Sequence, residues 1–367
     1  MAAPAPLTDG LTWLAQPVDK GPLAGVRVLD FSELLPGPFL TRNLVELGAD
    51  VIKIERPPNG DNTRVLSPGL FNAFNHGKRG GLLDMKDSGQ RQIAHDLART
   101  ADVLIESYRP GVMDRLGFSY ARLQADNPGL IYASLSGYGA NGPWRDLPGH
   151  DINYLAAAGI ASLSYSPENG KSLNQGVPVA DLAGATYALA AINAALLQRV
   201  RTQKGQYLDV SITDCMAHWM NARRAVFQYR QTDDLQEQRN QVSLKPAYGV
   251  FKCADGKRLT LAAIEQHFWD RLVAVLDLTE QAACWNSHQA RFKRAEEINA
   301  CIALTISRLT RDDLIKRLRD ADVPAMEVFE PNEISRLDHF VQRGLFDQSE
   351  SELARFPVPM TRSESTS

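Results

Sequence analysis

The feature that most constrains the fold of this chain is a strand–turn–helix pattern that recurs in residues 1–140. Runs of branched apolar residues with the length of a buried strand occupy 26–31, 51–55, 102–107 and 130–139. Segments with helical character lie between them at 41–50, 90–99 and 120–128. Successive strands that are joined by helices pair in parallel and are covered on both faces. The pattern therefore predicts an open, doubly wound α/β layer.

The remainder of the chain completes the large layer and predicts a second, smaller body. Asp181 opens a long helix with one apolar stripe, and a strand follows at 206–212. The polar stretch 231–245 is interpreted as a linker. After it come a hairpin at 247–264 and helices at 265–276, 287–309 and 311–320. We expect a large domain in 1–225, a linker with a small α+β domain in 226–330, and a return to the large domain in 331–367.

Composition excludes several classes of protein. The net charge is −3 and the basic residues are dispersed, which argues against a nucleic-acid partner. No run approaches the ~18 apolar residues of a membrane span, and the N-terminal residues do not resemble a secretion signal. The four cysteines are widely spaced and have no metal-ligand spacing. We expect reduced thiols, no metal site and a cytoplasmic location.

Cations gather just after the predicted strand ends. They are Lys53, Arg56, Lys78, Arg79, Arg109 and Arg115. Ligands bind at the carboxyl ends of parallel strands, and cations there suit a phosphorylated ligand, although each could equally belong to a solvated basic face. The first turn lacks GxGxxG and carries Pro36 and Pro38 in place of glycines, which disfavours a dinucleotide-dependent oxidoreductase.

Three ionisable residues stand at places suited to chemistry. His150 follows a Pro-Gly turn, Asp181 starts a helix, and Glu265 lies where an apolar strand passes into a helix. Each has a structural alternative: a hydrogen-bonded loop histidine, an N-cap, or a carboxylate that complements a helix dipole. If the ligand is an acyl thioester, an imidazole and a carboxylate can exchange a proton at its α-carbon. An aspartate at a helix start is expected to stay ionised.

Several motifs together are highly specific. They are PLAGVRVLDFSELLPGP, LGADVIKIERP, NHGKRGGLLDMK, ADVLIESYRPGVMDRLGF, NPGLIYASLSGYGANGPW, TQKGQYLDVSITD and RGLF. Through them residues 21–350 resemble the class III CoA-transferases of the CaiB/BaiF type, and most closely their α-methylacyl-CoA racemase-like branch. The resemblance implies that Asp181 matches the aspartate that accepts the acyl group in the transferases. GHDINYLA and AIE match the racemase signatures that carry His150 and Glu265, and Tyr248 matches a tyrosine in the preceding strand.

The resemblance also implies a binding mode and an assembly. CoA, as part of the substrate and not as a permanently bound cofactor, is expected in the loops that hold the cations named above and Tyr108. The implied architecture is a large Rossmann-like domain with an open parallel sheet plus a smaller α+β domain, in an interlocked homodimer. In that arrangement His150 and Asp181 meet Glu265 of the partner subunit.

The chain departs from both branches at the substrate pocket. Leu35 lies near the position of a transferase glutamine, and the glycine-rich flap of formyl-CoA transferases is absent. The racemase AIEPQF is AIEQHF here, and Val177 replaces an asparagine that racemases tend to have. The first hypothesis is racemisation at the α-carbon of a 2-methylacyl-CoA-type thioester through an enolate. The alternatives are CoA transfer between carboxylic acids through an aspartyl intermediate, and acyl-CoA binding without catalysis.

Overall fold

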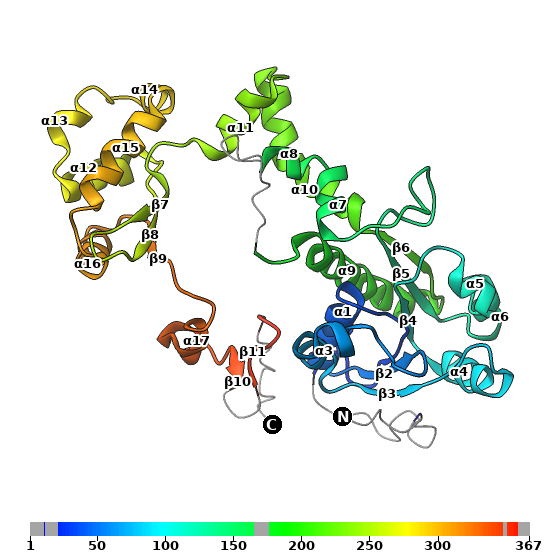
Figure 1. Ribbon diagram of the computed structural model, residues 1–367. Helices are drawn as coiled ribbons and strands as arrows, with labels where there is room; N and C mark the ends of the chain where they lie inside the picture. The colour runs from blue at the N-terminus through cyan, green and yellow to red at the C-terminus, as the bar shows by residue number, and fades with distance from the viewer. Residues whose placement is uncertain (1–10, 12–20, 165–175, 348–350, 359–367) are drawn as a thin grey trace. The chain divides into compact units, whose positions relative to one another are not determined.

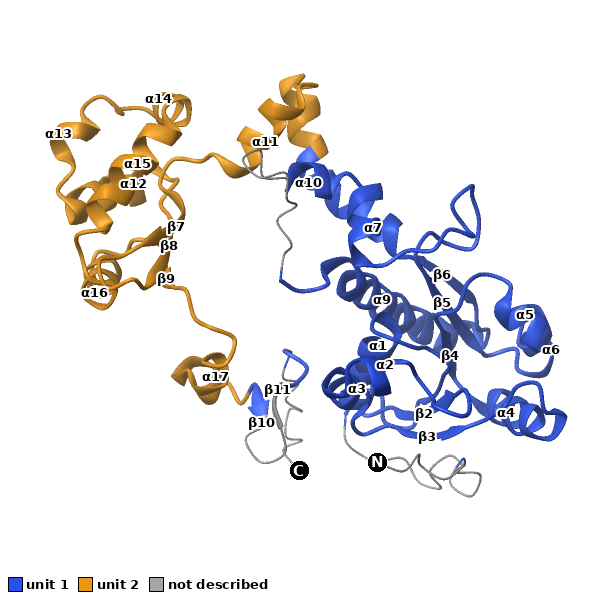
Figure 2. Ribbon diagram, viewed as in Figure 1, with its two compact units in different colours: residues 1–223, 345–367 blue, residues 224–344 orange. Residues whose placement is uncertain are grey.

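The chain consists of two compact units. The computed structural model describes residue 11 and residues 21–164, 176–347 and 351–358. Unit 1 comprises residues 1–223 with 345–367, and unit 2 comprises residues 224–344 (Figure 2). The domain ranges expected from the sequence differ from these units mainly at the second boundary, which follows Gly344 and not residue 330. The division into domains at residues 225 and 330 stays a prediction.

A six-stranded parallel sheet organises unit 1 (Figure 1). Its strands are β1 (Arg27–Asp30), β2 (Asp50–Glu55), β3 (Arg79–Leu82), β4 (Val103–Glu106), β5 (Ile131–Ser136) and β6 (Tyr207–Ser211). The order is β3-β2-β1-β4-β5-β6, and every neighbouring pair is parallel. This is the strand order of a Rossmann-like, doubly wound sheet, so the α/β prediction is confirmed.

Helices cover both faces of this sheet. Successive residues of a strand point to opposite sides, so each strand contributes to the apolar layer on either face. Val28 packs in the layer that holds α1 (Pro36–Glu46) and α9 (Val179–Thr202). Its neighbour Leu29 packs in the opposite layer with α4 (Ser88–Thr100) and α6 (Tyr120–Asp126). Strands β2, β4 and β5 are consequently buried almost throughout, whereas the edge strands β3 and β6 are partly exposed.

The other elements of unit 1 are short, apart from one long helix. They are α2 (Thr63–Leu66), α3 (Pro68–Asn75), α5 (Val112–Leu116), α7 (Asp151–Ala157), α8 (Ile160–Leu163), the strands β10 (Phe346–Asp347) and β11 (Ser351–Ala354), and α10 (Ile212–Arg230), which continues into unit 2. Helix α9 is long and apolar enough to cross a membrane, by length and composition alone, and 44% of its most apolar 18-residue segment is buried. Its buried residues belong to the core beneath the sheet, which accounts for its apolar character.

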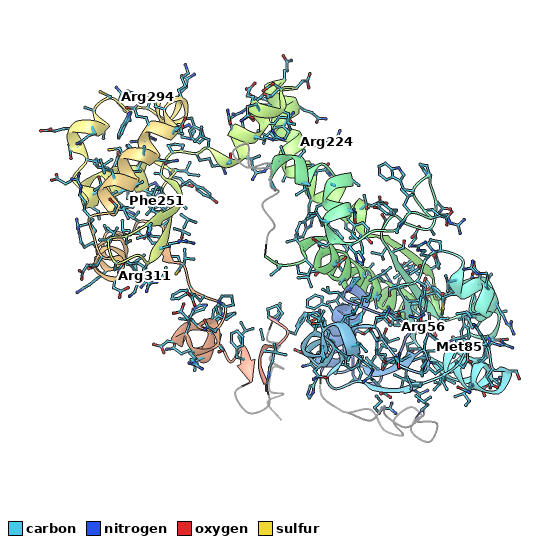
Figure 3. All side chains as sticks on the ribbon, in the orientation of Figure 1. Arg56, Met85, Arg224, Phe251, Arg294 and Arg311 are labelled. Carbon is cyan, nitrogen blue, oxygen red and sulfur yellow. The ribbon has the colours of Figure 1, made fainter. Side chains whose placement is uncertain are left out.

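Unit 2 is a small α+β body. Strands β7 (Tyr248–Lys252), β8 (Arg258–Ala262) and β9 (Ala325–Glu327) form an antiparallel sheet. The helices are α11 (Leu235–Ser243), α12 (Gln266–Leu276), α13 (Thr279–Ala282), α14 (His288–Lys293), α15 (Ala295–Ile306), α16 (Arg311–Asp320) and α17 (Asp338–Gln342), with a 3-10 turn at Ile334–Arg336. Phe251, labelled in Figure 3, packs in its core with Trp269 and Ile302.

Three sequence expectations about helices are wrong. Helix α1 begins at Pro36, ahead of the expected residue 41, because proline fits the first turn of a helix, where an N–H needs no partner. Most of the expected linker 231–245 is helix α11, capped by the Asp234 side chain. The helix expected at 287–309 divides into α14 and α15 at Arg294.

Candidate functional site

The carboxyl ends of β1 and β4 form the point where the strand order of the sheet reverses. The two strands are neighbours, and the chain runs into α1 after one and into α5 after the other. Glu33, after β1, donates its main-chain N–H to Oγ of Ser107, after β4, at 2.9 Å. The Tyr108 hydroxyl donates to Oε1 of Glu33 at 3.4 Å. These bonds join the two loops at the crevice where doubly wound sheets bind ligands.

Arg56 borders this crevice from the loop after β2. Its guanidinium makes a two-point ion pair with Glu33, with Nε–Oε1 and Nη2–Oε2 distances of 2.6 and 2.8 Å. The hydrogen bond with Glu33 raises the pKa of Arg56. Its side chain, labelled in Figure 3, is more than half exposed. The predicted CoA contacts Arg56 and Tyr108 therefore share one acidic partner.

Lys53 and Lys78 are buried beneath the same edge of the sheet, each with 2% of its side chain exposed. Lys53 Nζ lies 3.2 Å from Oδ2 of Asp61 and donates to the Ser32 carbonyl at 2.5 Å. Lys78 Nζ lies 3.3 Å from Oδ2 of Asp30. Burial lowers the pKa of Lys78 to about 7, although Asp30 works against that shift. Both ammonium groups have partners inside the protein, which favours a structural role for them.

Asp30 shows the other half of this buried network. Burial opposes its ionisation, but Lys78, Lys53 and two hydroxyl donors outweigh burial and hold its pKa below the ordinary value. A cavity of about 260 Å³ adjoins the network and is lined in part by Lys53 and Lys78. Its other charged lining residues are also paired, Arg64 with Glu55 and Arg79 with Asp50.

The arginines after β4 are exposed. Within the described residues, the side chains of Arg109 and Arg115 make no hydrogen bond or ion pair. A Cβ added to Gly111 would lie 3.4 Å from an Arg115 nitrogen and 3.6 Å from an Arg145 nitrogen, so two guanidinium groups converge on this glycine. Sequence analysis missed Arg145, although it is a cation in the loop that follows β5, the same signal that singled out the others.

A second cluster of ionisable residues joins α7 to α9. His150 is the exposed N-cap of α7, and its main-chain N–H donates to Asn153 Oδ1 at 3.0 Å. The next residue, Asp151, accepts hydrogen bonds at Oδ1 from the main-chain N–H of Ala180 at 2.6 Å and of Asp181 at 3.2 Å. The structure thus connects the residue after His150 directly to Asp181.

The expectation that Asp181 stays ionised through the helix dipole is wrong. Burial, helped by the nearby Asp151 carboxylate, raises the pKa of Asp181 to about 7. The dipole of a helix start contributes less than removal of a carboxylate from water. Near neutral pH this carboxyl therefore exchanges its proton readily, which is suited to an acid–base group and also leaves a fraction available as a nucleophile.

Aromatic packing fixes the turn that carries His150. The buried Tyr154 donates its hydroxyl to the Gly149 carbonyl at 2.6 Å and lies edge-on to Tyr138, with ring centroids 5.3 Å apart. Burial raises the pKa of Tyr154. A Cβ at Gly137 or at Gly149 would lie 2.4 or 2.7 Å from the Tyr154 ring. Glycine is required at both positions by this close approach.

Glu106, at the end of β4, was missed by sequence analysis. It is 5% exposed, and its Oε2 accepts the Tyr108 main-chain N–H at 2.8 Å. Burial raises its pKa to about 7, against the lowering effect of hydrogen bonds from Ser134 and Tyr108. A glutamate that ends an otherwise apolar strand of a parallel sheet is the sequence signal for such a group.

The other predicted residues are described by their own elements. In unit 1, Leu35 is the half-buried N-cap of α1 and Val177 is 57% exposed, two residues before α9. In unit 2, Glu265 is the exposed N-cap of α12, and Tyr248 in β7 carries the Lys245 ammonium 4.8 Å from its ring centroid. Within the described ranges, no three histidine, cysteine or acidic side chains are grouped to hold a metal ion.

Comparison with curated proteins identifies several relatives. The chain is 43% identical over 201 residues to an acetyl-CoA:oxalate CoA-transferase of Acetobacter aceti, a match that covers 53% of this chain and 52% of that one. It is 30% identical to a succinate–glutarate CoA-transferase of Agrobacterium fabrum, covering 92% of this chain and 87% of the relative. It is 31% identical to the human α-methylacyl-CoA racemase, covering 92% and 86%.

A solved structure and a family model agree with these matches. The chain resembles a CaiB/BaiF family protein from Brucella suis with a TM-score of 0.81 and 28% identity, covering 94% of this chain and 93% of that one. The model of CoA-transferase family III matches residues 23–366. This protein belongs to CoA-transferase family III, and it is an enzyme of the CoA-transferase or racemase type.

Proposed function

We propose that the protein transfers CoA between carboxylic acids, with Asp181 as the residue that accepts the acyl group. The observation that carries this proposal is the half-buried Asp181 carboxyl in the first turn of α9. Relatives of this chain that are CoA-transferases support the same chemistry. Sequence analysis placed racemisation first. The comparisons support the transferase alternative better.

The proposed chemistry begins with attack of the ionised Asp181 carboxylate on the thioester carbonyl of an acyl-CoA. The carbon–sulfur bond breaks, the CoA thiolate leaves, and a mixed anhydride forms on Asp181. The thiolate then attacks the aspartyl carbonyl and releases the first carboxylic acid, which leaves an aspartyl–CoA thioester. A second carboxylate repeats these steps in reverse, so that it gains CoA and Asp181 is restored as a carboxylate.

The CoA part of the substrate is assigned to the carboxyl edge of the sheet. Arg109, Arg115 and the newly found Arg145 offer exposed guanidinium groups, which bind phosphate oxygens through charge-assisted hydrogen bonds. Arg56 and Tyr108 border the same edge. In this assignment Lys53 and Lys78 hold the loops together from beneath, without touching the substrate.

Proton transfer at an α-carbon is the second candidate. His150 precedes the carboxylate that bonds Asp181, and the Asp181 pKa of about 7 is suited to both removal and return of a proton. The human racemase relative supports the same chemistry. In this case His150 and Asp181 act on opposite faces of the α-carbon, and an enolate forms between the two proton transfers.

The decisive experiment compares Asp181→Ala, His150→Ala and the unaltered enzyme. Acetyl-CoA with oxalate and succinyl-CoA with glutarate serve as substrate pairs, and a 2-methylacyl-CoA in D₂O serves as the probe of α-hydrogen exchange. We expect hydroxylamine to inactivate the unaltered enzyme only in the presence of acyl-CoA, and we expect Asp181→Ala to lose both transfer and this sensitivity. Transfer should persist in His150→Ala, which removes a group that only proton transfer requires.

Two other outcomes would change the assignment. Deuterium uptake at the α-carbon that His150→Ala abolishes, without acid-dependent release of CoA, would establish the racemase instead. Full transfer activity in Asp181→Ala would reject the proposed function. Arg99→Ala is a suitable control variant, because this exposed side chain on α4 pairs with Asp96.

The assembly and location are proposed with the same function. We expect an interlocked homodimer in which Glu265 of the partner subunit completes the site. Mixed dimers of Asp181→Ala and Glu265→Ala subunits should then regain activity that neither variant has alone. All four cysteines are free of disulfides, and this is consistent with the reducing cytoplasm.

A further inference from the structure

The start of α9 has an unusual cap. Pro178 at the N-cap position provides no side-chain hydrogen bond to the helix. The first N–H groups of a helix need partners from outside it, and here the Asp151 carboxylate of another helix supplies them. Asp151 is separated from Ala180 by 29 residues along the chain, so this contact is a tertiary one.

Asp151 also occupies the first position of α7, directly after His150. One side chain therefore belongs to the helix that follows His150 and is bonded to the main chain of Asp181 itself. A shift of α7 against α9 would break the 2.6 Å bond to the Ala180 N–H. The separation of His150 and Asp181 is thus linked to this single carboxylate.

We propose that Asp151 is a positioning residue, whose carboxylate anchors the first turn of α9 to α7 and so holds Asp181 in register with His150. This inference rests on the proposed role of Asp181 as a reacting group. Catalysis depends steeply on such placement, because a displacement of about 1 Å can reduce a rate by about 100-fold.

The charge of Asp151 has a second effect that is separable from its hydrogen bonds. A carboxylate held this close disfavours the ionisation of Asp181, and Asp151 is the charged group that, after burial, raises the pKa of Asp181. The phenol of Tyr154 also faces Asp181, and Tyr138 packs on Tyr154. His150, the N-cap of α7, directly precedes Asp151.

Two substitutions separate these effects. Asp151→Asn keeps an oxygen that accepts the Ala180 and Asp181 N–H groups but removes the charge. Asp151→Ala removes both. Asp234→Asn is the matched control for Asp151→Asn, because Asp234 caps α11 through the Glu237 N–H at 2.7 Å, and this change removes the charge of an equivalent cap elsewhere in the chain.

The test measures kcat and KM across pH 5–9 with acetyl-CoA and oxalate or succinyl-CoA and glutarate. We expect Asp151→Asn to retain kcat at pH 8 and to shift the acidic limb of the kcat profile down by about one pH unit. We expect Asp151→Ala to lower kcat at pH 8 by about 10- to 100-fold, with KM for the CoA donor changed less than about twofold. Asp234→Asn should leave both parameters and the pH limb unchanged.

An unchanged acidic limb in Asp151→Asn, or an unchanged kcat in Asp151→Ala, would overturn the inference. If Asp151→Ala does not fold, Asp151→Asn still tests the charge effect, because its cap is preserved. The proposed function fails separately, when Asp181→Ala retains activity and acyl-CoA gives no hydroxylamine sensitivity. If the enzyme catalyses α-hydrogen exchange and no CoA transfer, the rate of that exchange replaces kcat in the comparison of the same variants.

Discussion

Two sets of cations lie at the carboxyl edge of the unit 1 sheet, and they differ in burial and in the number of partners that their side chains have within the described residues. Lys53 and Lys78 are buried and bonded to aspartates and main-chain carbonyls. Arg109 and Arg115 are exposed. The sequence placed both sets just after strand ends, but Lys53 lies within β2 and Lys78 directly precedes β3. The comparison teaches that burial separates cations that hold the edge together from cations that are available to a ligand.

The difference follows from the residue types. A buried ammonium loses its hydration and is stable only with close partners, so it is already committed to the protein. An exposed guanidinium keeps its fork of donors for planar anions such as phosphate. Arg56 is intermediate, because it is exposed but shares Glu33 with Tyr108. A ligand phosphate at Arg56 would compete with that carboxylate.

The largest effect that tests this comparison is expected from Lys53→Met. This change leaves Asp61 buried without its cation, and removal of one partner from a buried pair destabilises a protein by about 3–5 kcal/mol. Arg56→Met in the same region should cost less than about 1 kcal/mol, since its side chain is more than half exposed. Urea unfolding of both variants measures the difference. Equal losses would break the distinction between the two sets.

The next effect concerns the buried Glu106, whose pKa burial raises, whereas the neighbouring lysines hold the pKa of Asp30 down. Its folded pKa of about 7 exceeds the ordinary value of 4.5, so the folded state binds the proton more tightly. Stability from this group is therefore complete below pH 4.5 and falls as the pH rises toward 7, by about 3 kcal/mol in total. Glu106→Gln does not titrate and should lose less stability than the unaltered protein between pH 5 and pH 8.

Unfolding free energies at these two pH values provide the check. An identical decline in both proteins would show that Glu106 ionises as easily in the folded chain as in the unfolded one. Asp181→Asn is a useful companion variant, because the Asp181 pKa is raised in the same direction.

The smallest effect is expected for the exposed arginines. Arg115→Ala should raise the KM for acyl-CoA about tenfold, equivalent to about 1.4 kcal/mol, with kcat and stability little changed. Arg145→Ala should have a similar effect, because both guanidinium groups converge on Gly111. Steady-state kinetics at low and high salt measures both. An unchanged KM in both variants would remove these arginines from the CoA site.

The sequence predicted the parallel sheet well, because strands buried on both faces are continuous apolar runs. It predicted less about burial of charge. Lys53 lies between Ile52 and Ile54 in a strand that is covered on both faces, and this position explains its burial. The burial was not predicted, because a lysine is normally expected to be exposed. The same reasoning applies to Glu106 at the end of β4.

The candidate site was predicted as residue types and not as an arrangement. His150 and Asp181 were identified from motifs, but Asp151 was taken only as part of a signature. Its bonds to Ala180 and Asp181 depend on how α7 packs on α9, and local patterns carry no information on such a tertiary contact. The Asp181 pKa depends on the same contact, so the sequence predicted its direction wrongly.

The bond between Glu33 and Ser107 has a consequence for how the protein is made. Its partners are 74 residues apart, and β2 and β3 are synthesised between them before β4 takes its place beside β1. A nascent chain that has left the ribosome only as far as β3 has one wall of the crevice and lacks the other. Because strands that are distant in sequence pair late, the two loops are joined only after β4 and the residues that follow it have been translated.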